Sequence, residues 1–207
     1  MKIPTIEQAT AMLAKAEQMN PGAWVAHSRS AADNAKRIAE KCADMDASAA
    51  YVLGLLHDIG RREGVFYIKH IFDGWRYLSG LGFGDAAAIC LTHSFPNKDA
   101  HSYFGEYDCS PENVTFLEKF LAEREYDDYD RLIQLCDGLS MPQGAVLMDK
   151  RLVDVVMRYG FANFMLEKWQ AYFDLKNYFD AKANRNIYEF LPNVVENTFG
   201  FSQGGSI

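Results

Sequence analysis

The sequence predicts an all-α fold. Along most of the 207 residues, apolar side chains recur at three- and four-residue steps, which places them on one face of a helix. No stretch alternates between apolar and polar residues for long enough to indicate more than a short hairpin of strands. Residues that cap helices also stand in front of several apolar runs. We therefore expect a single domain over residues 1–207, with a helical-bundle core at about 23–140 and additional C-terminal helices at about 141–207.

The first three predicted helices are bounded by clear signals. Thr5 begins a capping-box sequence, and the helix that follows it should end at the Asn-Pro-Gly sequence of residues 20–22. A second helix is expected from about Ala23. Asp46 can cap a third helix, which we expect to end at Gly60.

Further helices are predicted around residues 67–79, 86–94, 111–123, 129–140, 149–159 and 163–182. Asp85 is a candidate cap for the 86–94 helix, and Ser110 before Pro111 suits the N-terminus of the next one. A last helical segment at 186–197 contains Pro192, so we expect it to be kinked or split.

Composition limits the classes of function. The formal net charge of −7 argues against an extended nucleic-acid-binding surface, although it allows a local basic pocket. No apolar run approaches the roughly 20 residues of a membrane span, and no signal-peptide hydrophobic region is found at the N-terminus. The four cysteines show no paired spacing. We expect a cytoplasmic protein with reduced cysteines and no membrane partner, and the sequence does not predict its oligomeric state.

Histidines and aspartates at predicted helix ends are the candidate site. Two of the histidines fall near helix starts and two near helix ends, and in an antiparallel bundle such ends meet at one level. Imidazole nitrogens and carboxylate oxygens are good ligands for iron, manganese, zinc or magnesium. The alternative is that each histidine is satisfied separately by its own neighbours. The candidates are His27, His57, His70, His93, Asp58 and Asp137.

Three segments in order carry a resemblance. HSRSAADNAKRIAE, then LGLLHDIG, then LCDGL resemble the His … His-Asp … Asp signature of the HD-domain superfamily, which are all-helical metal-dependent phosphohydrolases. The resemblance covers roughly residues 23 to 140. It implies an HD-domain-like bundle in which one divalent metal is held by four ligands, His27, His57, Asp58 and Asp137.

A second metal is implied by two more segments. HIFDGWRYL and ICLTHS are similar to segments of dinuclear HD proteins, so the resemblance implies that His70 and His93 bind a second ion and that Asp58 bridges the two. The gap from Asp58 to His70 is shorter than in many of those proteins. Ser94 stands where the cyclic-dinucleotide phosphodiesterase branch has another histidine, and the GYP motif of that branch is absent. A single ion with structural His70 and His93 is the alternative.

The implied activity is hydrolysis of a phosphate ester or anhydride, most naturally in a nucleotide, by a metal-activated water. Asp58 is the expected catalytic residue, because as a metal ligand it also orients that water. The ions are expected to be two divalent cations among Fe, Mn, Mg and Zn, and the partner a small phosphorylated substrate. Four cationic or hydrogen-bonding side chains are the substrate-binding candidates: Arg61, Arg62, Lys98 and His101.

Two other functions remain open from the sequence. A few HD-like diiron proteins use the same six-ligand set to activate oxygen, so an HD-type diiron oxygenase is one alternative. A non-catalytic, metal-stabilised ligand-binding domain is the other. The sequence does not distinguish these from hydrolysis, nor does it name the substrate or the native metal.

Overall fold

A computed structural model describes residues 1–201, and residues 202–207 of the predicted C-terminal extension lie outside the described residues. The described part forms ten α-helices, two 3-10 helices and one two-stranded antiparallel hairpin, so the predicted all-α fold class is confirmed. The elements before the hairpin are α1 Ile6–Met19, α2 Ala23–Ala39, α3 Ala47–Leu56, η1 Ile59–Glu63, α4 Lys69–Gly80, α5 Gly84–Thr92, α6 Pro111–Glu123 and α7 Asp128–Asp137. After them come β1 Ser140–Met141, β2 Gly144–Ala145, α8 Met148–Tyr159, α9 Met165–Lys182, η2 Ile187–Glu189 and α10 Val194–Phe199.

Side-chain caps start several of these helices. Thr5 and Gln8 form the predicted capping box of α1, and Asp46 accepts the backbone N–H groups of residues 48 and 49 at the start of α3. Ser110 caps α6 in the same way, with Pro111 in its first turn. The predicted cap at Asp85 is wrong. Helix α5 begins at Gly84, one residue before Asp85, so Asp85 lies inside the first turn. Its carboxylate accepts the backbone N–H of residue 2 instead.

One predicted boundary differs from the structure, and one predicted break is confirmed. Helix α3 ends at Leu56 instead of Gly60, because the chain tightens into the 3-10 helix η1 after the His-Asp pair. The segment 186–197 is split, as expected, into η2 and α10. Pro192 lies between them, and Asn193 adopts a left-handed conformation with φ of 56°.

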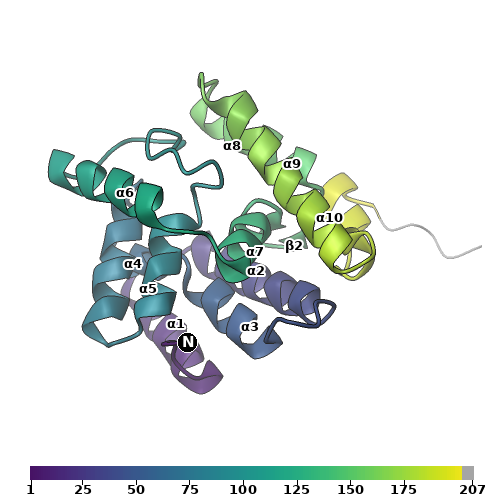
Figure 1. Cartoon of the computed structure of the whole chain (residues 1–207), viewed down its shortest axis with the longest axis horizontal. Coiled ribbons are helices and arrows are strands. Elements are labelled where there is room, and N and C mark those ends of the chain that lie inside the picture. The colour runs from purple at the N-terminus through teal and green to yellow at the C-terminus, as the bar shows by residue number, and fades with distance from the viewer. Residues whose placement is uncertain (202–207) are drawn as a thin grey trace, which may run out of the picture.

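The helices form a layered bundle (Figure 1). Helices α2, α3 and α7 occupy its middle, α4, α5 and α6 lie on one side, and α8, α9 and α10 lie on the other. Apolar side chains from both the central and the C-terminal helices build one large core, which includes Leu53 of α3, Leu132 of α7 and Phe179 of α9. A smaller core joins α4, α5 and α6 around Phe72 and Leu117. Among the described residues, no helix combines the length and the apolar composition that crossing a bilayer requires.

Candidate metal centre

The side chains of His57 and Asp58, at the end of α3, both reach the same group of candidate ligands. Consecutive residues of an α-helix project about 100° apart, so they do not normally share a target. Here His57 directly follows the last residue of α3 and keeps a helical backbone, with φ −57° and ψ −35°, and Asp58 leaves the helix with φ −103° and ψ 12°. The change of backbone conformation at this junction lets His57 and Asp58 enter the same group of candidate metal ligands.

Two glycines of the LGLLHDIG segment bring the neighbouring helices close enough to complete the group. A Cβ at Gly54 would lie 2.7 Å from the Cα of Ala32, so its absence allows α3 to pack tightly on α2, the helix that carries His27. A Cβ at Gly60 would lie 1.9 Å from the backbone oxygen of His70. Only glycine permits that approach, which brings α4 against the segment that carries Asp58.

The first group of ligand atoms contains His27, His57 and Asp58, whose nitrogen and oxygen atoms lie within 4.8 Å of one another. Asp137, from the end of α7, joins this group. Its Oδ1 lies 2.9 Å from Nε2 of His27 and 3.9 Å from Nε2 of His57. The four residues that the resemblance assigns to a first metal therefore converge in space, as expected.

The second group is built on the other oxygen of the same carboxylate. Oδ1 of Asp58 lies 3.0 Å from Nε2 of His70 and 3.7 Å from Nε2 of His93, and these three side chains also lie within 4.8 Å of one another. Oδ2 of Asp58 lies 3.9 Å from Nε2 of His57. Asp58 thus stands between the two groups, in the position that a bridging ligand requires.

Three of the four imidazole rings, those of His57, His70 and His93, are oriented by the backbone. Nδ1 of His57 donates to the carbonyl oxygen of Gly54 at 2.7 Å, and Nδ1 of His93 donates to that of Cys90 at 3.0 Å. His70 donates from Nδ1 to the carbonyl of Tyr67. A proton on Nδ1 leaves Nε2 as a lone-pair donor, which is the arrangement that metal-ligating histidines use.

Two atoms at the centre lack any partner among the described residues. Nε2 of His57 and Oδ1 of Asp58 are buried and accept no hydrogen bond. Buried polar atoms are normally paired, so an unpaired ligand atom in each of the two groups indicates that each group can accept a cation. The residues present fit one or two divalent ions bound by nitrogen and oxygen ligands.

The protonation states also suit a cation. Burial raises the pKa of the Asp58 carboxyl, but the Arg61 guanidinium opposes this, and the pKa lies well below its usual range. Burial likewise raises the pKa of Asp137, and the hydrogen bond from His27 more than offsets it. Burial lowers the pKa of His93 to about 3. Ionised carboxylates and neutral imidazoles are the forms that bind metal.

A comparison with family models identifies the family of the segment that carries this candidate metal centre. The model of the HD domain matches residues 24–141, which is more than half of the chain. The chain belongs to the HD domain family. No curated protein and no solved structure matches it. The HD superfamily consists mostly of metal-dependent phosphohydrolases, and its fold implies that the chain binds divalent metal.

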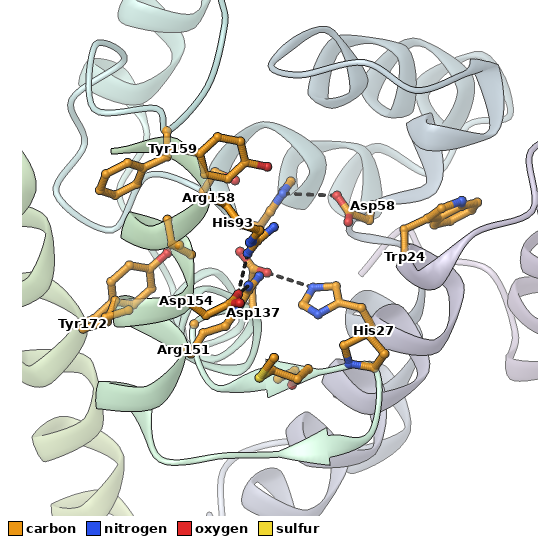
Figure 2. A pocket seen from close by; sticks show the side chains of 18 of the residues that line it. Trp24, His27, Asp58, His93, Asp137, Arg151, Asp154, Arg158, Tyr159 and Tyr172 are labelled. Atoms are coloured by element: carbon orange, nitrogen blue, oxygen red, sulfur yellow. Dashed lines mark hydrogen bonds and ion pairs between the residues drawn. The ribbon is translucent and has the colours of Figure 1, made fainter. Parts of the chain in front are cut away.

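A cavity of about 430 Å³ opens beside the candidate metal centre of this HD domain. Figure 2 shows Trp24, His27 and Asp58 on one side of it and a wall from the C-terminal helices on the other. The HD match ends before that wall, so it comes from the C-terminal extension. The wall contributes Arg151, Asp154, Arg158, Tyr159, Lys168 and Tyr172.

Sequence analysis missed the residues of this wall. Arg151, Asp154 and Arg158 recur at three- and four-residue steps in α8, which would have indicated a shared helix face but not what the face covers. Lys168 stands among the aromatic and charged residues of α9 without any motif around it. Its place at the cavity depends on how α9 packs against α7, which no local pattern specifies.

Of the four substrate-binding candidates, only Arg61 lines the cavity. Its Nε donates to Oδ2 of Asp58 at 2.7 Å, and its Nη1 donates to the backbone oxygen of Phe66 at 3.2 Å. These bonds fix the guanidinium beside the metal centre. Tyr103, from the long loop after α5, lines the cavity near it, and burial raises the pKa of its hydroxyl.

The other three candidates lie outside the cavity. The guanidinium of Arg62 stacks 4.1 Å from the ring centre of Tyr77, because the 3-10 helix turns it away from Arg61. Nζ of Lys98 donates to the backbone oxygen of residue 124 at 2.7 Å. His101 is exposed and lies 2.7 Å from a carboxylate oxygen of Glu118. None of the three lines the cavity.

Proposed function

We propose that this HD domain hydrolyses a phosphate ester or anhydride with the help of two divalent ions. The observation that carries the proposal is the position of Asp58, whose two carboxylate oxygens face separate groups of nitrogen ligands at the edge of a cavity. Two-metal sites with a shared ligand are a common arrangement for displacement at phosphorus. His27, His57 and Asp137 would hold one ion, and His70 and His93 the other.

The chemistry that such ions supply is a water of lowered pKa and a polarised phosphoryl oxygen. The residues of the chain would do the rest. Asp58 would serve as a metal ligand and would also orient the attacking water. Its carboxylate is held in place for this by the 2.7 Å hydrogen bond from Arg61. Arg61 remains charged, since its ion pair with Asp58 raises its already high pKa against the effect of burial. Its position at the cavity would let it contact oxygens of the bound phosphate.

We further propose that the substrate is a nucleotide. The cavity volume of about 430 Å³ falls within the range of small-molecule sites. Aromatic side chains line it from opposite sides, with Trp24 on α2, Tyr103 and Phe104 on the long loop, and Tyr159 and Tyr172 on the C-terminal helices. Aromatic faces beside cationic groups favour a ligand with both a planar ring and a phosphate.

Metal analysis of the anaerobically purified protein, combined with a substrate screen, tests the proposal. We expect close to two ions per chain, and release of phosphate or of a nucleoside product from members of a nucleotide and phosphomonoester panel with manganese or magnesium under anaerobic conditions. His57→Ala should lose metal and activity together, whereas Arg62→Ala, which alters a neighbouring side chain outside the cavity, should keep both.

The same experiment separates the other functions. Oxygen consumption by a mixed-valence diiron form, without anaerobic phosphate release, would identify an oxygenase instead. Bound metal with no turnover of any panel member would favour a ligand-binding domain. Activity that survives His57→Ala would contradict the assignment of the metal centre.

A further inference from the structure

Lys168 is a buried cation without an anionic partner. The residue is 3% exposed, and no carboxylate of the described residues lies within ion-pair distance of its Nζ. Lysines are almost never buried this completely unless they are paired, because removing an ammonium from water is costly. Burial accordingly lowers the pKa of Lys168 to about 7. The charged form of Lys168 therefore lowers the stability of the folded protein, and no ion pair within the described residues compensates for its burial.

The surroundings of Lys168 leave it able to bind a ligand. Its Nζ donates one hydrogen bond, to the backbone oxygen of Ser102 at 2.5 Å, so two of its three N–H donors remain available. The rings of Phe95, Phe104 and Phe164 lie 5.5–5.9 Å from it and exclude water from those directions. Lys168 also lines the cavity, so a ligand bound in the cavity could accept hydrogen bonds from the remaining donors.

Two arginines of α8 add positive charge to the same wall (Figure 2). Arg151 and Arg158 both donate to Oδ2 of Asp154, at 3.1 and 2.8 Å. One carboxylate therefore neutralises two guanidinium groups, which leaves a net positive charge on α8 in addition to Lys168. The metal centre lies on the other side of the cavity, and Arg61 is already paired there with Asp58. The cavity thus has a second region that attracts anions.

We propose that Lys168, with Arg151 and Arg158, forms a subsite for a second anionic group of the substrate, apart from the phosphate that reacts at the metal centre. The inference rests on the proposed function, and it narrows the substrate class to phosphate compounds that carry another phosphate or a carboxylate. A second phosphate would come from a nucleoside diphosphate or a bisphosphate. A carboxylate would come from a phosphorylated acid, which would then replace the nucleotide as the substrate.

Sulfate is a suitable probe because it mimics phosphate but does not titrate between pH 5 and 9. Its affinity is to be measured by calorimetry at constant ionic strength for the metal-containing wild type and for three variants of α9. Lys168→Met keeps the length of the side chain without its charge, and Lys168→Arg keeps the charge. Lys176→Met is the matched control on the same helix, since Lys176 is paired with Asp180.

At pH 6 we expect Lys168→Met to bind sulfate at least about tenfold more weakly, and Lys168→Arg and Lys176→Met to bind like wild type. Above pH 7 wild-type affinity should fall as Lys168 loses its proton, while Lys168→Arg keeps its affinity to pH 9. The carboxylates whose charges act on Lys168 are Asp137 of α7 and Asp99 of the long loop. The hydrogen bond from His27 holds the pKa of Asp137 far below this range, so Asp137 does not produce the change.

The outcomes separate the subsite from the metal centre. Sulfate binding that is lost in Lys168→Met but retained in His57→Ala supports the subsite, even if no phosphatase activity is found. Binding that is unchanged in Lys168→Met overturns the subsite, even if the protein proves to be a phosphohydrolase. If Lys168→Met does not fold, the comparison of wild type with Lys168→Arg across pH decides, because identical pH profiles would overturn the proposal.

Substrate pairs then identify the second anionic group. Glycerol 3-phosphate, 3-phosphoglycerate and a nucleoside monophosphate and diphosphate pair differ in whether they carry another carboxylate or phosphate. We expect kcat/KM to be at least about tenfold higher for the members with the second anion, and this preference to disappear in Lys168→Met. Preference for the diphosphate assigns a phosphate to the subsite, and preference for 3-phosphoglycerate assigns a carboxylate. Equal rates for all compounds would overturn the proposal.

Discussion

Replacing Lys168 by methionine should stabilise the protein, and by an amount that depends on pH. Burial lowers the pKa of this lysine from 10.5 to about 7 in the folded protein, whereas the unfolded chain keeps the ordinary value. Below pH 7 the ammonium is charged in both states, so the full cost of burying it is present. Between pH 7 and 10.5 the folded protein binds fewer protons than the unfolded chain, so this contribution to stability rises with pH.

The difference between these pKa values sets the size of the effect. At 1.36 kcal/mol for each pH unit, it corresponds to on the order of 5 kcal/mol in the free energy of unfolding at pH 6. Methionine fits the aromatic surroundings of Lys168 and needs no hydrogen-bond partner. We therefore expect Lys168→Met to be more stable than wild type by several kcal/mol at pH 6, with a much smaller gain at pH 9.5.

Urea denaturation of metal-containing protein at both pH values, in buffers without phosphate or sulfate, measures this difference. Comparing variant with wild type at each pH cancels the titration of other buried groups, such as His93 and Asp137. Lys176→Met is the control for the loss of a lysine from α9. A gain that is the same at pH 6 and 9.5, or a variant that is less stable than wild type at pH 6, would refute the reasoning.

Three more predictions concern the metal centre. His70→Ala should lower the metal content by about one ion per chain, measured by mass spectrometry, and should also lower the melting temperature because His70 is 1% exposed; an unchanged metal count would leave a mononuclear site. Gly60→Ala should remove the same ion by pushing α4 away, since its Cβ would meet the backbone of His70, and a normal metal count would show that η1 can shift instead. Arg61→Lys should reduce kcat/KM by about tenfold through loss of the forked contact, with Arg62→Ala as the unaffected control, and equal rates for both would contradict the role of Arg61.

The fold class and the candidate ligands could be predicted because both depend on local signals. Three of the four proposed caps, at Thr5, Asp46 and Ser110, use a side chain within three residues of the N–H that it binds. The ligands were assigned by the resemblance to the HD signature, which is also local: His57 and Asp58 are adjacent, and each other ligand lies near one end of its own helix. The structure confirms that they converge, while their binding of metal remains a prediction. The sequence did not show how deeply these ligands would be buried, and His70 is 1% exposed.

Only Arg61 of the four substrate-binding candidates lines the cavity, because closeness in sequence does not fix the direction in which a side chain points. Arg61 and Arg62 are neighbours, yet a 3-10 helix sends one to Asp58 and the other onto the ring of Tyr77. Lys98 and His101 follow His93 closely in sequence, but the loop turns both side chains away from the cavity. Lys98 donates to the backbone oxygen of residue 124, and His101 pairs with Glu118. A side chain in a loop takes the partner that tertiary packing offers it, and no local pattern records that choice.

The two halves of the cavity therefore depend on different kinds of information. The metal half rests on contacts between α2, α3, α4, α5 and α7, where Gly54 and Gly60 allow the close approach of helices that brings the ligands together. The cationic half rests on α8 and α9, which lie outside the matched HD domain. If the metal half performs the hydrolysis and the cationic half selects the substrate, then changes at Lys168 should alter which compounds react while leaving the metal content unchanged. Changes at His57 should remove the reaction for all of them.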